Sequence, residues 1–340
     1  MRRGTRSNVT HDKEARTLRR MRWMMLLVPA IGAFHPALAA ERFPAKPVRV
    51  VVPFPAGGST DLIARQLGQR LAEVWGHPVL IDNRSGAGGV IGSDYAAKAA
   101  PDGYMLVMGS VSTHAIIPHI NSKMPYDPIA DFTAITEVAR FPSMLVANSA
   151  LPVRTVKQLV ALAKQRPGEL TYASNGTGTN SHLAGELLKT AAGIDLLHVP
   201  YKGAAPAIID VGAGHVAMMF TGVANGLSYV KSGRLRAIAV ASMQRSPNLP
   251  DVPTFEESGM RGVDVTIWLG LWGPRTMPSE LANRIQSDFA TALKNPQVQQ
   301  LFAAQDAQAV GSTPAEFAMR VRQELARWGK IVQAAKLKPE

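Results

Sequence analysis

The amino-acid sequence predicts an α/β protein with two lobes that are joined by two crossover segments. Short β-rich runs alternate with longer helical stretches from residue 47 onward, and two segments interrupt that alternation. The chain has 340 residues, of which 46% are hydrophobic, so it is long enough for two domains with substantial cores. Strands that alternate with helices are typical of βαβ units and a parallel sheet.

The first part of the pattern runs to residue 148. A valine-rich run predicts a buried strand over 48–54, and apolar residues three to four positions apart predict a helix over 60–75. A strand at 79–82, a helix at 89–100 and a strand at 104–109 follow. Residues 131–148 instead predict two consecutive strands with a weak break at 140–142. This stretch suits a crossover between lobes.

The remaining elements complete two lobes. Helices are expected at 155–165, 179–192 and 203–212, and strands at 170–174, 195–199, 215–220 and 235–240. The polar, proline-rich segment 242–251 predicts a loop and a second crossover. A strand at 263–272 and helices at 279–294 and 313–334 follow. We therefore predict a discontinuous first lobe, residues 41–139 with 241–340, and a continuous second lobe, residues 140–240.

The first 40 residues have the pattern of a secretory signal peptide. They hold eight of the 37 Lys and Arg residues against two acids, followed by an apolar run from Trp23 to Ala40 that two prolines interrupt. The prolines argue against a membrane-spanning helix, and the small residues at its end fit cleavage near Ala39 or Ala40. Arg19 and Arg20 leave a twin-arginine route open beside the general secretory route, and Met21 is an alternative start.

Charge and cysteine content exclude several classes of function. Half of the net charge of +12 lies in the N-terminal segment, and the later basic residues form no stripe interleaved with aromatics, so no nucleic-acid partner is expected. The chain has no Cys, which excludes disulfides, thiol catalysis and Cys-ligated metals. Because no later apolar run reaches 18 residues, the mature chain is not expected to span a membrane.

Motifs for cofactors and catalysis are also missing. The sequence contains no P-loop and no nucleophile elbow, and the glycine run 86–92 departs from the dinucleotide-binding pattern. The histidines lack metal-ligand spacing. We therefore expect no cofactor, no metal and no catalytic residue.

Polar or glycine-rich loops follow several predicted strands and precede helices. Ligands of α/β proteins bind at the carboxyl ends of strands, so these loops are candidate binding sites, although an ordinary capped turn explains the first loop equally well. Lys202 is a possible partner for an anion, with simple solvation as the alternative. The candidate ligand-binding residues in these loops are Ala56, Gly57, Gly58, Ser59, Thr60, Asp61, Ser112, Thr113, Asn175, Gly176, Thr177, Thr179, His182, Tyr201, Lys202 and Gly203.

Five segments, in this order, resemble one known family. They are residues 47–61, 82–92, 100–106, 173–179 with 182–186, and 199–203. Together they resemble the Bug family of extracytoplasmic solute receptors, the substrate-binding components of tripartite tricarboxylate transporters. The resemblance covers nearly the whole mature chain.

The resemblance implies a type II periplasmic-binding-protein fold that closes on a small organic carboxylate, a di- or tricarboxylate or a related acid. It also implies a periplasmic location, a monomer, and membrane permease subunits as partners. The resemblance further implies that the segment 217–222 faces the ligand, which adds Thr221 to the candidate ligand-binding residues. Relatives are expected to carry an acidic residue in this segment, and its absence here favours a plain carboxylate over an acidic amino acid. Two alternatives stay open: a receptor that reports to a signalling partner, and an exported hydrolase in which His182 activates Ser181 or Ser59.

Overall fold

The computed structural model describes Met1, residues 43–334 and Leu337. The chain divides after Arg42, and every helix and strand described below belongs to the part that begins at Phe43. The predicted signal peptide, apart from Met1, lies outside the described residues. No helix in the described ranges is long and apolar enough to cross a membrane.

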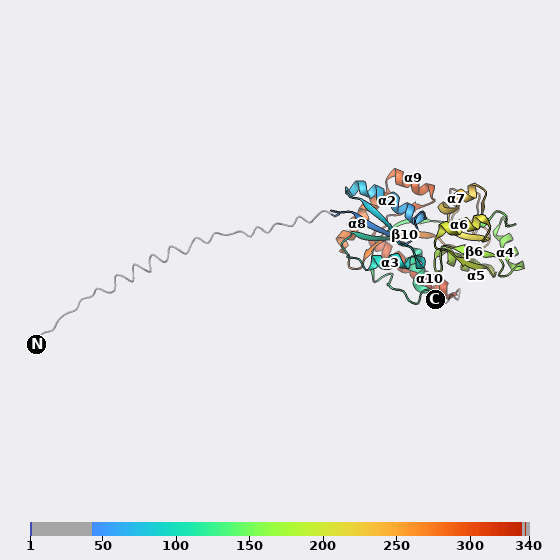
Figure 1. Cartoon of the computed structure of the whole chain (residues 1–340), viewed down its shortest axis with the longest axis horizontal. Coiled ribbons are helices and arrows are strands. Elements are labelled where there is room, and N and C mark those ends of the chain that lie inside the picture. Colours follow the sequence, from blue (N-terminus) through green and yellow to red (C-terminus); the bar gives the residue numbers. More distant parts are fainter. Residues whose placement is uncertain (2–42, 335–336, 338–340) are drawn as a thin grey trace. The chain divides into compact units, whose positions relative to one another are not determined.

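Two mixed β-sheets organise this part of the chain (Figure 1). The first sheet has six strands in the order β11-β4-β10-β3-β1-β2, and the second has five in the order β7-β6-β8-β5-β9. The first sheet consists of β1 (Val48–Val52), β2 (Val79–Asn83), β3 (Met105–Ser110), β4 (Phe132–Phe141), β10 (Ile267–Pro274) and β11 (Gln308–Ala309). The second consists of β5 (Ser143–Asn148), β6 (Thr171–Ser174), β7 (Leu197–Pro200), β8 (Met218–Gly222) and β9 (Leu235–Ala241).

The strand directions correct the expectation of wholly parallel sheets. Strand β1 is parallel to β2 and β3, and β6 is parallel to β7 and β8. However, β10 is antiparallel to β3 and β4, and β5 is antiparallel to β8 and β9. The reason lies in the connections, because parallel neighbours that follow one another in the chain need a crossover connection within one sheet. Strands β5 and β10 are each entered from the other sheet.

The chain passes between the sheets twice. Strand β4 ends at Phe141 and β5 begins at Ser143, so only Pro142 separates a strand of the first sheet from a strand of the second. The return follows β9, through residues 242–266, which contain neither a helix nor a named strand. The lobe boundaries at residues 140 and 240 stay a prediction.

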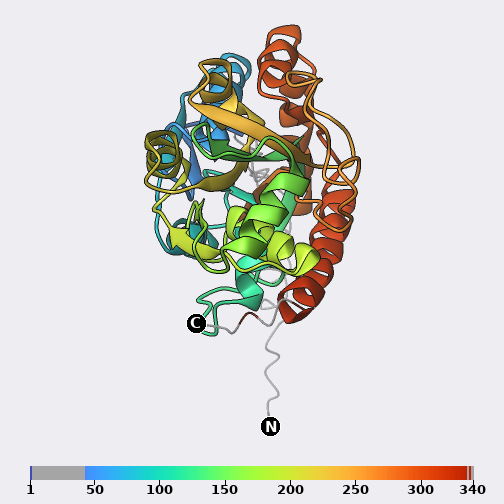
Figure 2. The same cartoon turned by 90° about the vertical axis from the view of Figure 1, so that its right-hand side faces the viewer.

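Helices cover both faces of both sheets. On the first sheet, α2 (Ser59–Trp75), α8 (Ser279–Leu293) and α9 (Pro296–Ala304) pack on one face, and α3 (Val90–Ala97) and α10 (Pro314–Ala334) on the other. On the second sheet, α6 (Ala204–Ala213) and α7 (Val223–Lys231) pack on one face, and α4 (Val156–Gln165) and α5 (Asn180–Ala192) on the other. Helix α10, red in Figure 2, packs on β4 and on the short π-helical turn Ser112–Ile116.

Side-chain alternation explains why each sheet is covered on both faces. In β5, Met144 and Val146 enter the core beneath α6 and α7, whereas Leu145 and Ala147 enter the core on the opposite face. Successive residues of a strand point to opposite faces, so a continuous apolar run needs a partner layer on each side. The predicted helices at 60–75, 89–100, 155–165, 179–192, 203–212, 279–294 and 313–334 are confirmed within a few residues.

Two helices were not predicted from the sequence. Helix α7 begins at Val223, directly after β8. No turn lies between them, so the apolar pattern of the strand continues into that of the helix. Helix α9 begins after Asn295, whose side chain accepts hydrogen bonds from the backbone amides of Gln297 and Val298, and Pro296 is its first residue. A polar cap followed by Pro is a recognisable helix start, so this signal was present in the sequence.

An aromatic cluster fills the space between α10 and the first sheet. The buried Glu324 carboxylate accepts hydrogen bonds from the indole nitrogens of Trp268, at 3.2 Å, and Trp328, at 3.1 Å. Gly270 of β10 lies directly under the Phe317 ring, where a Cβ would come within 1.9 Å of a ring carbon. The cluster therefore depends on one buried acid and on the missing side chain of one glycine.

Candidate functional site

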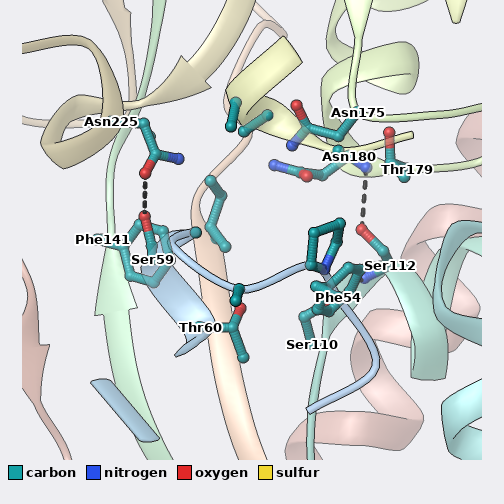
Figure 3. Close-up of a pocket in the computed structure, with 18 residues that line it drawn as sticks. Phe54, Ser59, Thr60, Ser110, Ser112, Phe141, Asn175, Thr179, Asn180 and Asn225 are labelled. Atoms are coloured by element: carbon teal, nitrogen blue, oxygen red, sulfur yellow. Dashed lines mark hydrogen bonds between the residues drawn. The ribbon is translucent and has the colours of Figure 1, made fainter. Parts of the chain in front are cut away.

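A pocket of about 80 Å³ lies where loops from both sheets meet (Figure 3). Most of it is formed by residues that follow the carboxyl ends of β1, β3, β6, β7 and β8. Because one water molecule needs roughly 10–15 Å³, this volume fits a small molecule. The lining residues are Phe54, Pro55, Ala56, Gly58, Ser59, Thr60, Ser110, Ser112, Phe141, Asn175, Thr179, Asn180, Gly203, Ala204, Ala205, Gly222, Asn225 and Ile267.

Four helices begin at this pocket. They are α2, α5, α6 and α7, and their N-cap residues are Gly58, Thr179, Gly203 and Gly222, none of which makes a side-chain cap hydrogen bond. Among the helices that begin elsewhere, α4 and α9 have cap side chains that accept from the backbone, whereas α3 and α8 begin at Gly89 and Pro278 without such a bond. The N-terminus of a helix carries unpaired N–H groups and the positive end of the helix dipole. The pocket thus collects four partial positive charges.

Three asparagine amides add further donors. The amide nitrogens of Asn175, Asn180 and Asn225 point toward the middle of the pocket (Figure 3). Two of these residues also join the two sides of the pocket. The Ser59 hydroxyl donates to the Asn225 side-chain oxygen at 3.0 Å, and the Asn180 backbone amide donates to the Ser112 hydroxyl at 3.1 Å.

The pocket is polar without being charged. None of the described residues that line it is Asp, Glu, Lys, Arg or His. The rings of Phe54 and Phe141 and the side chain of Ile267 supply apolar walls. Elsewhere in the described residues, no group of three His, Asp or Glu side chains is placed to hold a metal ion. The arrangement suits an anion held by neutral donors.

Twelve of the predicted residues line this pocket or the groove beside it. Ala56, Gly58, Ser59, Thr60, Ser112, Asn175, Thr179 and Gly203 line the pocket. Gly176, Thr177, Tyr201 and Lys202 line an adjoining groove of about 490 Å³, which also includes residues 85–89 and shares Phe54, Pro55, Asn175 and Gly203 with the pocket. The sequence-derived loops therefore do meet in space.

Asp61 lies behind the first loop and does not line the pocket. Its carboxylate accepts hydrogen bonds from the Gly57 amide at 2.9 Å, from Arg65 at 3.0 Å and from Asn83 at 3.0 Å. Burial acts to raise the pKa of Asp61, but the hydrogen bonds and the Arg65 charge hold that pKa below its usual value. The ionised carboxylate therefore holds the Gly57 turn and is neutralised locally by Arg65.

Thr113, His182 and Thr221 also lie outside the pocket lining. The Thr113 hydroxyl bonds to the backbone of Ser110 and closes the turn after β3. The His182 Nδ1 atom accepts a hydrogen bond from the Gly178 amide at 3.2 Å. Thr221 is buried within β8. Gly57 is the remaining predicted residue outside the pocket lining, and its amide donates to Asp61 as described above.

Comparison with known proteins places the chain in a family. Residues 63–337 match the family described as the tripartite tricarboxylate transporter family receptor. The chain belongs to this family. The receptor is 36% identical to protein BugT of Bordetella pertussis over 324 residues, which are 93% of this chain and 99% of BugT. The resemblance found in the sequence is therefore confirmed.

Solved structures of related proteins share the receptor's fold. A protein of R. palustris, Rpa4515, solved with adipate, is 35% identical with a TM-score of 0.85, and the match covers 88% of this receptor and 100% of that chain. MatC of Rhodopseudomonas palustris, solved with bound malate, is 31% identical with a TM-score of 0.82, covering 85% and 100%. The predicted α/β fold of the periplasmic-binding-protein type is confirmed.

The Ser–His pairs of the hydrolase alternative do not form in the receptor. Ser181 accepts a hydrogen bond from the Asn175 backbone amide and contacts the Thr179 hydroxyl at 3.0 Å. Ser59 donates to Asn225. His182 uses its Nδ1 atom for a backbone amide, so neither serine has this histidine as its base.

Sequence reasoning missed several lining residues of the receptor. Asn225 sits in α7, which was not predicted, although an Asn three residues after a strand-ending Gly222 is a usable signal. Phe141 and Ile267 lie at the points where β4 leaves and β10 enters the first sheet. No local pattern marks such crossover residues as pocket walls.

Proposed function

We propose that this receptor binds a small organic carboxylate in the pocket and delivers it to membrane permease subunits. The observation that carries the proposal is the convergence of four helix N-termini and three asparagine amides on an uncharged pocket. Carboxylate oxygens only accept hydrogen bonds, and each of these groups donates. The related receptors solved with adipate and with malate support this ligand class.

The donor set is sufficient for tight binding without a salt bridge. A Kd near 1 µM requires about −8 kcal/mol. A hydrogen bond to a charged group contributes about 1.5–3 kcal/mol, so five or six bonds of about 2.5 kcal/mol each meet that requirement when association costs about 4–7 kcal/mol. The predicted ligand-binding residues that line the pocket, together with Asn180 and Asn225, supply that number.

The apolar walls narrow the ligand further. Phe54, Phe141 and Ile267 favour an acid with an apolar chain, such as a C4–C6 dicarboxylate. The lining contains no acidic side chain to pair with an ammonium group, which disfavours an amino acid. Lys202 in the adjoining groove is the positive side chain placed to attract an anion toward the pocket.

Location and motion follow from the same proposal. The basic and apolar pattern of residues 1–40 supports export to the periplasm, with cleavage near Ala39 or Ala40. Ligand binding favours a closed arrangement if the ligand contacts both sides of the pocket at once, and donors from both sides, such as the Thr60 hydroxyl and the Asn225 amide, line it.

A thermal-shift screen tests the proposal. The chain without residues 1–40 is unfolded and refolded to remove bound ligand, then tested with adipate, malate, citrate, aspartate, glutamate and nicotinate. A ligand at 100 times its Kd adds about 2.7 kcal/mol of stability, which raises the Tm by about 5–10 °C for a chain of this size.

Dimethyl adipate is the matched control because it keeps the chain of adipate and lacks the charges. We expect an acid to raise the Tm and the diester to leave it unchanged. A cooperatively folded sample that responds to none of the acids, or equally to adipate and its diester, contradicts carboxylate binding.

A further inference from the structure

The loop between β6 and α5 has an unusual backbone that is held from behind. Gly176 and Gly178 have φ values of +135° and +80°, which residues with a side chain rarely adopt. The Gly176 amide donates to the Ser174 hydroxyl at 3.2 Å, and the Gly178 amide donates to His182 Nδ1 at 3.2 Å. On the other side, Asn175 and Thr179 of the same loop face the pocket.

A second histidine completes the support. His198 of β7 places its Nε2 atom 2.6 Å from the Ser174 hydroxyl. Its ring stacks on the His182 ring, with centroids 4.1 Å apart and planes inclined by 17°. The Tyr172 ring also stacks on His198, at 4.9 Å. Both histidines therefore reach the loop backbone, His182 directly and His198 through Ser174.

The hydrogen-bond donors determine where each ring carries its proton. A backbone N–H can only donate, so His182 Nδ1 must be unprotonated and the ring proton sits on Nε2. The Ser174 hydroxyl is fully buried and accepts from the Gly176 backbone amide. Its own hydrogen also needs an acceptor, and among the described residues His198 Nε2 is the one that lies within hydrogen-bond distance, so we infer that the hydroxyl donates to this atom. The His198 proton then sits on Nδ1. The two neighbouring rings hold opposite tautomers.

We propose that His182 and His198 are positioning residues, a pair of neutral rings in opposite tautomers that holds the 175–179 loop in its ligand-binding shape. The effect on affinity rests on the proposed carboxylate function, whereas the effect on the loop does not. A proton added to His182 Nδ1 would face the Gly178 N–H, and the hydrogen bond would be replaced by repulsion.

The surroundings keep both rings neutral at ordinary pH. Burial lowers the pKa of each histidine to about 4, and the Lys189 charge acts in the same direction on both. The neighbouring His182 ring also acts to lower the pKa of His198. Glu186 acts to raise the pKa of His198, but its carboxylate is engaged by the Tyr172 hydroxyl at 2.6 Å and by Lys189 at 3.1 Å.

Nitrogen NMR of the histidine rings in the refolded, ligand-free protein tests the pair directly. We expect an Nε2–H ring for His182 and an Nδ1–H ring for His198 at pH 7. The opposite tautomer in either ring, or a charged ring at that pH, overturns the proposal. This measurement needs no ligand and no variant.

Substitutions then separate positioning from packing. His182→Asn keeps an acceptor near the place of Nδ1 but does not titrate, whereas His182→Leu removes the acceptor. His198→Gln and His198→Leu form the corresponding pair. We expect the Leu variants to raise the hydrogen-exchange rate of the Gly176 or Gly178 amide and to weaken adipate binding by roughly tenfold, as for one lost hydrogen bond.

The variants that keep an acceptor, His182→Asn and His198→Gln, should bind adipate within about threefold of the native affinity, a smaller change than the loss of one hydrogen bond causes. The native protein should expose the Gly178 amide as the pH falls toward 4, and His182→Asn should not. Leu variants that fold and protect both amides as the native protein does would overturn the proposal. If the native protein binds none of the acids but shows the expected tautomers and exchange, the carboxylate function fails and the positioning role stands.

Discussion

Asn225→Asp places a negative charge in the pocket with almost no change of shape. The native amide nitrogen points into the pocket, and its oxygen accepts from Ser59. The substitution replaces a donor by an acceptor, which forfeits about 1.5–3 kcal/mol of a hydrogen bond to a charged ligand. Two like charges about 4 Å apart at an effective dielectric of about 20 add about 4 kcal/mol of repulsion. Affinity for adipate should fall at least a thousandfold, since about 1.4 kcal/mol corresponds to a factor of ten.

Isothermal titration calorimetry between pH 5 and 8 measures the effect. Asn295→Asp is the matched control, because Asn295 caps α9 away from the pocket and Asp caps a helix equally well. The control should bind adipate as the native protein does, and the Asn225→Asp variant should recover affinity toward low pH as its carboxylate gains a proton. A loss smaller than tenfold at pH 7 would refute the orientation of the Asn225 amide.

Three further predictions concern stability. Burial lowers the pKa of His114 to about 3, against about 6.5 in the unfolded chain, so its contribution to stability is complete above pH 6.5 and is lost as the pH falls toward 3. In urea unfolding between these pH values, His114→Phe should lose about 1.4 kcal/mol less unfolding free energy per pH unit than the native protein. The same dependence of unfolding free energy on pH in both proteins would contradict this. Gly270→Ala should overpack the Phe317 ring, cost about 1–3 kcal/mol of stability and lower the Tm. Gly212→Ala is the control, because its added Cβ meets only an ordinary contact at 3.6 Å, and it should not lower the Tm. Equal Tm values for the two variants would argue against close packing of Gly270 under Phe317. Glu324→Leu should cost about 2–5 kcal/mol in urea unfolding by leaving two indole N–H groups without an acceptor, and a loss under about 1 kcal/mol would show that they find other partners.

Much of the architecture follows from local sequence patterns. The valines of β1 and the apolar positions of α2 show their periodicity within one segment, because side-chain direction repeats every two residues in a strand and every 3.6 in a helix. The polar loops beginning at Ala56 and Asn175 are also predicted as binding loops from local sequence, because in each of them a strand, a glycine turn and a helix follow one another in the chain.

Tertiary structure decided the rest of the pocket and the direction of the strands. Ser59 and Asn225 are 166 residues apart, and Phe141 and Ile267 become neighbours of the pocket only because β4 and β10 pair. His182 looked like a ligand contact in the sequence, but the helical turn that follows the loop directs its ring to the Gly178 amide.

The physical reason is the range of the interactions. Periodicity, caps and turns involve residues within a few positions of one another, so the α/β class, most of the elements and the loops that approach a ligand can be predicted from local patterns. Which strand pairs with which, and which side chains complete the pocket, depends on burying apolar faces of segments that are far apart in the chain. Only the folded structure brings those segments together.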